Sequence, residues 1–405
     1  MNKTDKYFKA FWVLAMLLML TSMVIHYKQQ GIILGDHEWL WKECACTLKG
    51  VDSAIAIQQN MLFPDIGELP PSTATAPWTK TMGVLVHGAF LPYEASCVFY
   101  AILNFGAFFW MLYLVFQNMY KRTQSYEIAG MSILAIFSSW YFVDWIQMGN
   151  NGSIVCFLTI CAICLQDEHQ ILAGICAAVA MIKPQIVLPF FITWLFLRKW
   201  KLIITSVSIV LVSWWGSVYI TKVSPFVQLE NLLNMRVDMT EEYLVYGIFD
   251  QLRAYGVDTE LVMLLSMLAG TAVTIYLTYR YMVSKNNNTL FWSIYVIPAI
   301  VSVFWSYKSQ CDYNILPIIS IAIVEYWYQS NKTWKQLGIC VALAIVCMMK
   351  PFSVLGITLD RLGIWGRLDN VYMMNRFDLY VKSLFVIVGV LLYTSKNNPN
   401  KIESQ

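Results

Sequence analysis

Charged residues are scarce in this sequence. They make up 13% of the 405 residues, whereas an ordinary soluble domain carries about a quarter. Hydrophobic residues make up 58% and aromatic residues 15%. This composition excludes an ordinary soluble domain and indicates an all-α polytopic membrane protein.

Clustered basic charge and metal-ligand spacing are also missing. The net charge is only +3 and the basic residues are scattered, which excludes a nucleic-acid-binding surface. No Asp-x-Asp or Glu-x-Asp pattern occurs, and no Cys-x-x-Cys or Cys/His spacing suggests a metal site, because most of the 10 cysteines lie in apolar runs, where a thiol is a small hydrophobic group. We therefore expect no metal ion and no other cofactor. Neither internal repeats nor low-complexity linkers divide the chain, so we expect one domain over 1–405.

What the sequence does contain is a series of apolar runs. A run of about 20 residues crosses about 30 Å of hydrocarbon as a helix. On this basis we expect about twelve transmembrane helices, at 8–26, 94–118, 127–143, 151–165, 171–182, 185–197, 202–220, 258–280, 289–306, 313–328, 336–350 and 378–394.

The basic residues predict the orientation of these spans. Short links rich in lysine and arginine all fall on one side, which the positive-inside rule makes cytoplasmic. Both termini are then cytoplasmic, in a multi-pass protein of the bacterial inner (plasma) membrane. The long links, where we expect the non-membrane mass, face outside: 27–93, 221–257 and 351–377.

The stretch AVAMIKPQIVLPFF (178–191) places a lysine and a proline inside an apolar run. A break at Lys183-Pro184 gives two helices of about 12 to 13 residues, roughly 20 Å each, whose tip cannot reach the outer membrane surface. Because a charge at that depth must line a wet cavity, we expect a recessed helix hairpin with Lys183 at its tip. The alternative is a snorkelling lysine at an ordinary helix end, with Pro184 as the helix stop. The preceding hairpin is also short, and its tip holds Asp144, Asn150 and Asn151.

Four stretches carry a family pattern: GNNGSIVCFLTICAICLQDEHQILAGICAAVAMIKPQIVLPFFITWLFLRKWK (149–201), GDHEWLWKECACTLKGVDSAI (35–55), PPSTATAPWTKTMGVL (70–85) and SYKSQCDYNILP (306–317). In order and spacing the sequence resembles the polyprenyl-phosphate-sugar-dependent glycosyltransferases of family 87, in the GT-C superfamily. It departs from their usual pattern at Asn150, where glutamine is common, and at Ser53, where proline is usual.

The resemblance implies a GT-C-type helix bundle and an activity. The expected reaction transfers a mannose- or arabinose-like sugar from a polyprenyl-monophosphate donor to a lipid-linked or cell-surface glycan acceptor on the extracytoplasmic face. The donor and acceptor are then the only partners, without nucleic acid. The family is generally metal-independent, in agreement with the absence of ligand spacing.

Asp36 matches the catalytic aspartate of the resembling family, and we expect it to be the general base. The alternative for Asp36 is an interfacial or helix-capping carboxylate. Glu38 is a fallback base and a candidate for substrate contact, and His37 could shift the pKa of a neighbouring carboxylate.

We expect cations to bind the donor phosphate and short polar side chains to bind the sugar. Lys183 and Lys308 are the phosphate candidates, because charge-assisted hydrogen bonds are strongest where water is restricted; the alternative is an interfacial anchor. Asp312 follows Lys308 at a helix mouth, where it could pair with that lysine, contact sugar hydroxyls or cap the helix. The sugar candidates are Asp144, Asn150, Asn151 and Asp312.

Two other classes of protein fit parts of the pattern. A polymerase of the O-antigen or capsule type also has about twelve spans with basic outer loops, but it predicts paired functional arginines rather than an aspartate after the first helix. A secondary transporter would explain broken helices with charges inside the membrane, but it predicts related halves. The Lys-Pro pairs at 183 and 350 are the only hint of such halves.

Overall fold

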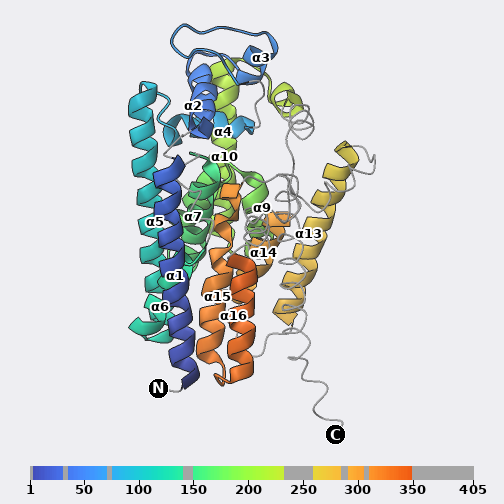
Figure 1. Ribbon diagram of the computed structural model, residues 1–405. Helices are drawn as coiled ribbons and strands as arrows, with labels where there is room; N and C mark the ends of the chain where they lie inside the picture. The colour runs from blue at the N-terminus through green and yellow to red at the C-terminus, as the bar shows by residue number, and fades with distance from the viewer. Residues whose placement is uncertain are drawn as a thin grey trace.

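The computed structural model describes residues 3–30, 35–70, 75–139, 149–231, 259–283, 291–304 and 310–348. The regular structure in these ranges is helical, apart from an isolated bridge between Phe63 and Gly67 (Figure 1). The expected span at 378–394, the outer link at 351–377 and most of the link at 221–257 lie outside the described residues.

A bundle of helices makes up the larger part of the described chain. Eleven of the twelve expected spans fall wholly or largely in the described ranges, and each contains a helix there. They are α1 (Lys3–Gln30), α5 (Tyr93–Thr123), α6 (Tyr126–Phe137), α7 (Asn151–Leu165), α8 (Gln170–Ala180), α9 (Pro184–Phe196), α10 (Trp200–Thr221), α13 (Thr259–Val283), α14 (Ser293–Phe304), α15 (Pro317–Gln329) and α16 (Trp334–Met348).

Length separates these helices into two groups. Three segments are long and apolar enough to cross a membrane by themselves, namely Lys3–Val24 in α1, all of α5 and all of α10. Shorter apolar helices include α6, α7, α8 and α9. The structure therefore confirms an all-helical membrane-type protein, whereas twelve complete spans are not established.

Ion pairs show that the short helices form hairpins. Lys121 at the end of α5 pairs with Glu168 just after α7 (2.6 Å), so α6 and α7 leave one end of the bundle and return to it. Lys199 just after α9 pairs with Asp167 just before α8 (2.5 Å), so α8 and α9 do the same. We call this end of the bundle, where Lys332 also pairs with Asp5 of α1, the basic end. The two predicted hairpins are thus confirmed.

Small residues let α8 approach α10 closely. A methyl group at Gly174 would lie 2.7 Å from the Leu202 carbonyl oxygen and 2.7 Å from Cβ of Thr205. Ala173 and Ala177 beside it are fully buried. In a bilayer, where the lipid is as apolar as the protein, such close packing is a main source of helix association. In contrast, α9 packs mainly against α13 and α14, so the two arms of the second hairpin have different main partners.

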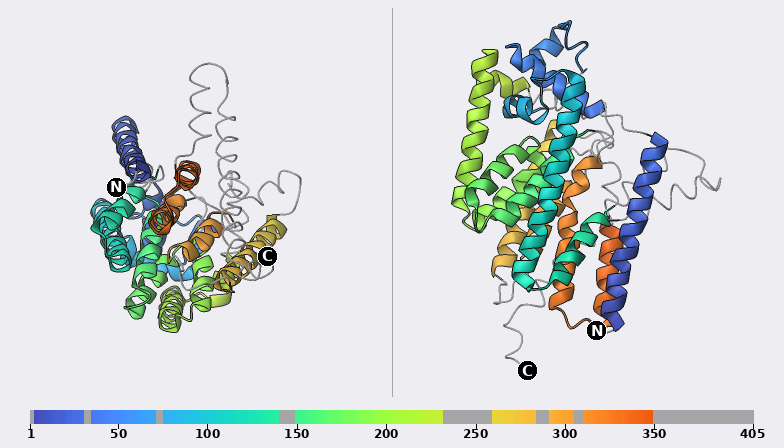
Figure 2. Two further views of the ribbon diagram at one scale, coloured as in Figure 1. Left: turned by 90° about the horizontal axis from the view of Figure 1, so that it is seen from below. Right: turned by 90° about the vertical axis from the view of Figure 1, so that its left-hand side faces the viewer.

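The link at 27–93, expected as a loop, contains three helices: α2 (Gly35–Leu48), α3 (Ser53–Gln58) and α4 (Pro77–Val86). We call these three helices the cap. Figures 1 and 2 show the cap at the end of the bundle opposite the N-terminus, beside the upper ends of α5 and α10. It has a small apolar cluster of its own, which includes Trp41, Cys44 and Ile66. A buried ion pair between Asp52 and Lys80 (2.8 Å) joins α3 to α4, and Asp52 also caps α3.

Candidate functional site

Four segments far apart in the chain meet between the cap and the bundle. They are the first turn of α2, the start of α7, the break between α8 and α9, and the 3-10 helix η2 (Gln310–Ile315). Each contributes one residue that the sequence analysis singled out. We call this set of four the polar chain: Asp36, Asn150, Lys183 and Asp312.

The polar chain is connected by short hydrogen bonds. Nζ of Lys183 donates to Oδ1 of Asp312 (2.7 Å) and to Oδ1 of Asn150 (2.6 Å). Nδ2 of Asn150 donates to Oδ2 of Asp36 (2.6 Å). The proposed base and the proposed phosphate partner are therefore joined through one amide.

The orientation of the Asn150 amide follows from its partners. Oδ1 of Asn150 accepts from Lys183 and also from the backbone N–H of Gly152 (2.8 Å), which makes Asn150 the N-cap of α7. Because both donors require an oxygen at this position, the amide nitrogen must face Asp36. Asn150 thus caps α7 with its side-chain oxygen and points its amide nitrogen at Asp36.

Lys183 lies at the N-cap position of α9, with Pro184 as the first helical residue. Helix α4 of the three-helix cap holds this turn in place. Trp78 Nε1 donates to the Met181 carbonyl (2.7 Å), and Thr79 Oγ1 donates to the Ile182 carbonyl (3.4 Å). These carbonyls end α8, where no intrahelical partner is available. The Lys183 side chain is only 14% exposed, whereas its depth in a membrane and the wet cavity expected around it stay predictions.

Asp312 is the most enclosed member of the polar chain, with no exposed side-chain surface. Its segment, η2, is tied to α7, because Asn314 Nδ2 donates to Ser153 Oγ (2.9 Å) and Cys156 Sγ contacts the Asp312 carbonyl. Removing one partner of a buried ion pair leaves an uncompensated charge and costs about 3 to 5 kcal/mol. Asp312 therefore fixes Lys183. From the sequence, Lys308 was one possible partner of Asp312, and Lys308 lies outside the described residues.

The remaining candidates are placed as follows. Asn151 is the first residue of α7 and is buried, and its side chain lies beside His87. Glu38 pairs with Lys42 one turn along α2 (2.8 Å), on a more exposed side of that helix. Asp144 and Lys308 lie outside the described residues.

Beside Asp36, two histidines that sequence reasoning gave little or no weight are buried together. Nδ1 of His37 lies 3.1 Å from Nδ1 of His87, and Nε2 of His37 lies 2.9 Å from Oγ of Ser96. Burial lowers the pKa of His37 to about 4 and that of His87 to about 3. Both rings are thus neutral near pH 7, so His37 does not place a positive charge next to Asp36.

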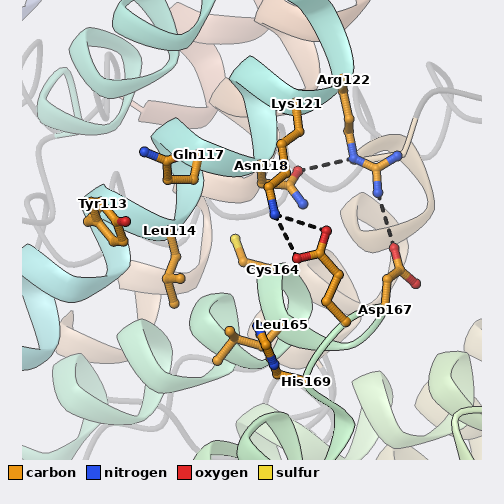
Figure 3. A pocket seen from close by; sticks show the side chains of 11 residues that line it. Tyr113, Leu114, Gln117, Asn118, Lys121, Arg122, Cys164, Leu165, Asp167 and His169 are labelled. Atoms are coloured by element: carbon orange, nitrogen blue, oxygen red, sulfur yellow. Dashed lines mark hydrogen bonds and ion pairs between the residues drawn. The ribbon is translucent and has the colours of Figure 1, made fainter.

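A cavity of about 280 Å³ lies elsewhere, at the basic end (Figure 3). Its charged lining is internally paired: Lys121 contacts both carboxylate oxygens of Glu168, and Arg122 contacts Asp167 (3.2 Å). These residues close the two helix hairpins at the end of the bundle away from Asp36. Within the described chain, the cavity and the polar chain are therefore separate features.

Comparison with known proteins supplies a family. The family model for glycosyltransferase family 87 matches residues 81–306, which is more than half of the chain. No curated protein and no solved structure matches the chain. The matched stretch contains Asn150 and Lys183. Asp36 and Asp312 lie outside it, and only the fold brings them to the matched residues.

Proposed function

The chain belongs to glycosyltransferase family 87 and is a membrane glycosyltransferase, and from this premise we propose that it transfers sugar at the polar chain, with Asp36 as general base. The single observation that carries this proposal is the hydrogen-bonded path from Asp36 through Asn150 to Lys183 and Asp312. Burying charged side chains costs free energy. Charged side chains that face the interior of a membrane protein are therefore typical of a functional site.

In the proposed reaction the donor is a polyprenyl-monophosphate sugar. An acceptor hydroxyl attacks the anomeric carbon, its proton passes to the Asp36 carboxylate, and the bond between that carbon and the phosphate oxygen breaks. Polyprenyl phosphate leaves with the bonding electrons. We propose an inverting transfer of a mannose- or arabinose-like sugar to a lipid-linked or cell-surface glycan, without a metal ion.

Lys183 is the proposed partner of the donor phosphate. The described charges in the polar chain are one lysine and two aspartates, so their sum is negative when all are ionised. A phosphate would be repelled by such a cluster unless a further cation joined it. This argument supports a second cationic partner, and Lys308, six residues before Asn314 in the same segment, stays our proposal for it.

The set of proposed sugar-binding residues differs from the set expected from the sequence, because Asn150 no longer belongs to it. Asn150 already uses both ends of its amide on Asp36, Lys183 and Gly152, so we propose that it positions the base. Asp144, Asn151, Glu38 and Asp312 remain candidates, but Asp312 is engaged with Lys183. The cap and the polar chain face outside in this proposal, and the basic end faces the cytoplasm of a bacterial plasma membrane.

The other two protein classes lose support. Family membership favours neither a glycan polymerase nor a secondary transporter. A transporter would also use a polar cluster between broken helices. The Lys-Pro pair at 350, which was the hint of a second half, lies outside the described residues.

Radiolabelled sugar transfer tests the proposal. Membranes containing matched amounts of wild type, Asp36→Asn or Lys121→Ala would be given a panel of polyprenyl-phosphate sugars. We expect label to enter lipid or glycan with wild type and with the basic-end control, and to be lost with Asp36→Asn. Transfer that survives Asp36→Asn would reject Asp36 as base, and transfer only from a lipid-diphosphate donor would reject the donor class.

A further inference from the structure

His37 is the next residue after Asp36 and lies in the same first turn of α2. Its side chain reaches into the protein, where it contacts His87 at the end of α4 and Ser96 in the first turns of α5. All three side chains are fully buried. The helix turn that carries the proposed base is therefore attached to two other helices by one imidazole.

The hydrogen positions in the cluster of His37, His87 and Ser96 follow from the Ser96 hydroxyl, which has one hydrogen to donate. Oγ of Ser96 donates its hydrogen to the His87 carbonyl (2.6 Å), so it can only accept from His37 Nε2. His37 then carries its proton on Nε2 and has a bare Nδ1. His87 must donate to that nitrogen from its own Nδ1. This order of donors and acceptors satisfies the two His37 contacts with both rings neutral, and it leaves His87 Nε2 as a buried acceptor without a hydrogen-bond partner among the described residues.

Aromatic rings hold the two imidazoles in this arrangement. The ring of Tyr100 stacks on both, with centroids 4.5 Å from His37 and 5.0 Å from His87. Tyr93 stacks on His37 at 6.0 Å. Packing on several sides restricts the imidazoles to one rotamer, and a restricted side chain transmits its position to the backbone that carries it.

The rest of α2 has a separate anchor. Trp41, one turn later, donates from Nε1 to the Leu91 carbonyl (3.2 Å) and packs against Tyr93. Among described residues of the first turn, Glu38 contacts only Lys42 of the same helix. His37 thus adds a second attachment of the first turn to the protein, beside the contact of Asp36 with Asn150, whereas Trp41 attaches the part of the helix that follows.

We infer that His37 and His87 form a positioning pair for Asp36, which holds the first turn of α2 so that the carboxylate stays in contact with Asn150. His37 follows Asp36 in the sequence, and His87 lies beside Asn151, which follows Asn150. The two histidines therefore act next to both ends of the hydrogen bond between Asn150 and Asp36. The effect on the rate of sugar transfer rests on the proposed function. The effect on the local structure of α2 does not.

The test compares His87→Leu, which removes the donor to His37, with His87→Asn, whose amide nitrogen replaces Nδ1. Lys42→Ala, which removes the contacts of the same helix with Glu38 and the Glu68 carbonyl but none with the histidines, is the control. Hydrogen exchange of residues 39–41 reports whether the first turn is held, because their N–H groups bond to carbonyls of that turn. We expect faster exchange in His87→Leu, and wild-type exchange in His87→Asn and Lys42→Ala.

Sugar transfer provides the second readout. A misplacement of about 1 Å costs on the order of 100-fold in rate, so we expect kcat of His87→Leu to fall by about this factor with an unchanged KM for the donor. His87→Asn should recover most of the loss. Wild-type exchange in His87→Leu would overturn the inference whatever the activity, as would an unchanged kcat beside an inactive Asp36→Asn. If wild type transfers no sugar, the proposed function fails and the exchange data alone decide the inference.

Discussion

The two ends of the bundle both carry networks of charge, but they differ in burial. At the basic end, Lys121 and Glu168 form a pair whose side chains are 56% and 58% exposed. In the polar chain, Lys183 and Asp312 form a pair whose side chains are 14% and 0% exposed. Exposed ion pairs contribute only about 0 to 1 kcal/mol to stability. Buried pairs are weak evidence for stability, because desolvation consumes most of their attraction.

This difference in burial indicates a structural role for the ion pairs at the basic end and a functional role for the polar chain. The basic-end pairs join the ends of helices that already pack against one another, and their side chains are between 15% and 58% exposed. The polar chain brings together residues from positions 36 to 312 at a site where apolar side chains would cost less. A carboxylate beside a fixed amide, with an ammonium behind it, is what acid–base and phosphate chemistry require.

Among variants that test the difference between the polar chain and the basic end, we expect the largest loss of stability and of transfer from a substitution of Lys183. Lys183→Met should lower the stability of the folded protein by about 3 to 5 kcal/mol, because the buried Asp312 carboxylate loses its ion pair with Lys183. It should also abolish transfer. Adding Asp312→Asn to Lys183→Met should restore the thermal unfolding temperature without restoring activity. If the double variant were active, Lys183 would be structural only.

A change at Asn150 tests the link between the two halves of the polar chain. Asn150→Asp replaces the donor facing Asp36 with a carboxylate, and like charges in contact repel. Since Lys183 can still bond to the new side chain, we expect the fold to persist and kcat to fall by about 10- to 100-fold. The initial rate of transfer at saturating donor measures this. A rate within twofold of wild type would contradict the role assigned to Asn150.

A third difference concerns the pH dependence of stability. Buried neutral histidines, His37 and His87, lie at the cap, whereas the described ion pairs at the basic end involve no histidine. Burial lowers the pKa of His37 to about 4 and of His87 to about 3, from an ordinary value of 6.5. Their contribution to stability is therefore complete above pH 6.5 and is lost as the pH falls toward 4 and 3. Thermal unfolding between pH 7 and pH 4 should show a decline that is smaller in His87→Asn.

The smallest effect is expected at the basic end. Lys121→Ala and Glu168→Gln should each change stability by no more than about 1 kcal/mol and leave transfer within twofold of wild type. Thermal unfolding and transfer rates measure both quantities. A large loss of activity in either variant would show that the two ends are not as different as their burial implies.

Much of the site was predictable because its residues disturb an otherwise apolar pattern. Lys183 interrupts an apolar run, and Asn150 precedes one, so the hairpins and their polar tips could be inferred from helix length alone. The pairing of Lys183 with Asp312 could not, because 129 positions separate them and no local pattern relates them. It depends on how η2 docks on α7.

The cap was the main omission. Its helices carry charges and buried polar groups such as His37, Glu43 and Lys80, which interrupt the apolar periodicity on which the prediction of spans depended. Three short helices with few apolar faces therefore looked like a loop. His87 and Trp78 were missed as structural contacts for the same reason, since their partners come from α2 and from the end of α8.

The most direct measurement is sugar transfer from polyprenyl-phosphate donors by Asp36→Asn, at protein levels and thermal stability matched to wild type. The substitution keeps the shape of the side chain and removes its basicity. General-base catalysis contributes about 100- to 10,000-fold, so the account predicts a loss of transfer of this size with donor binding retained. Transfer at the wild-type rate would contradict it.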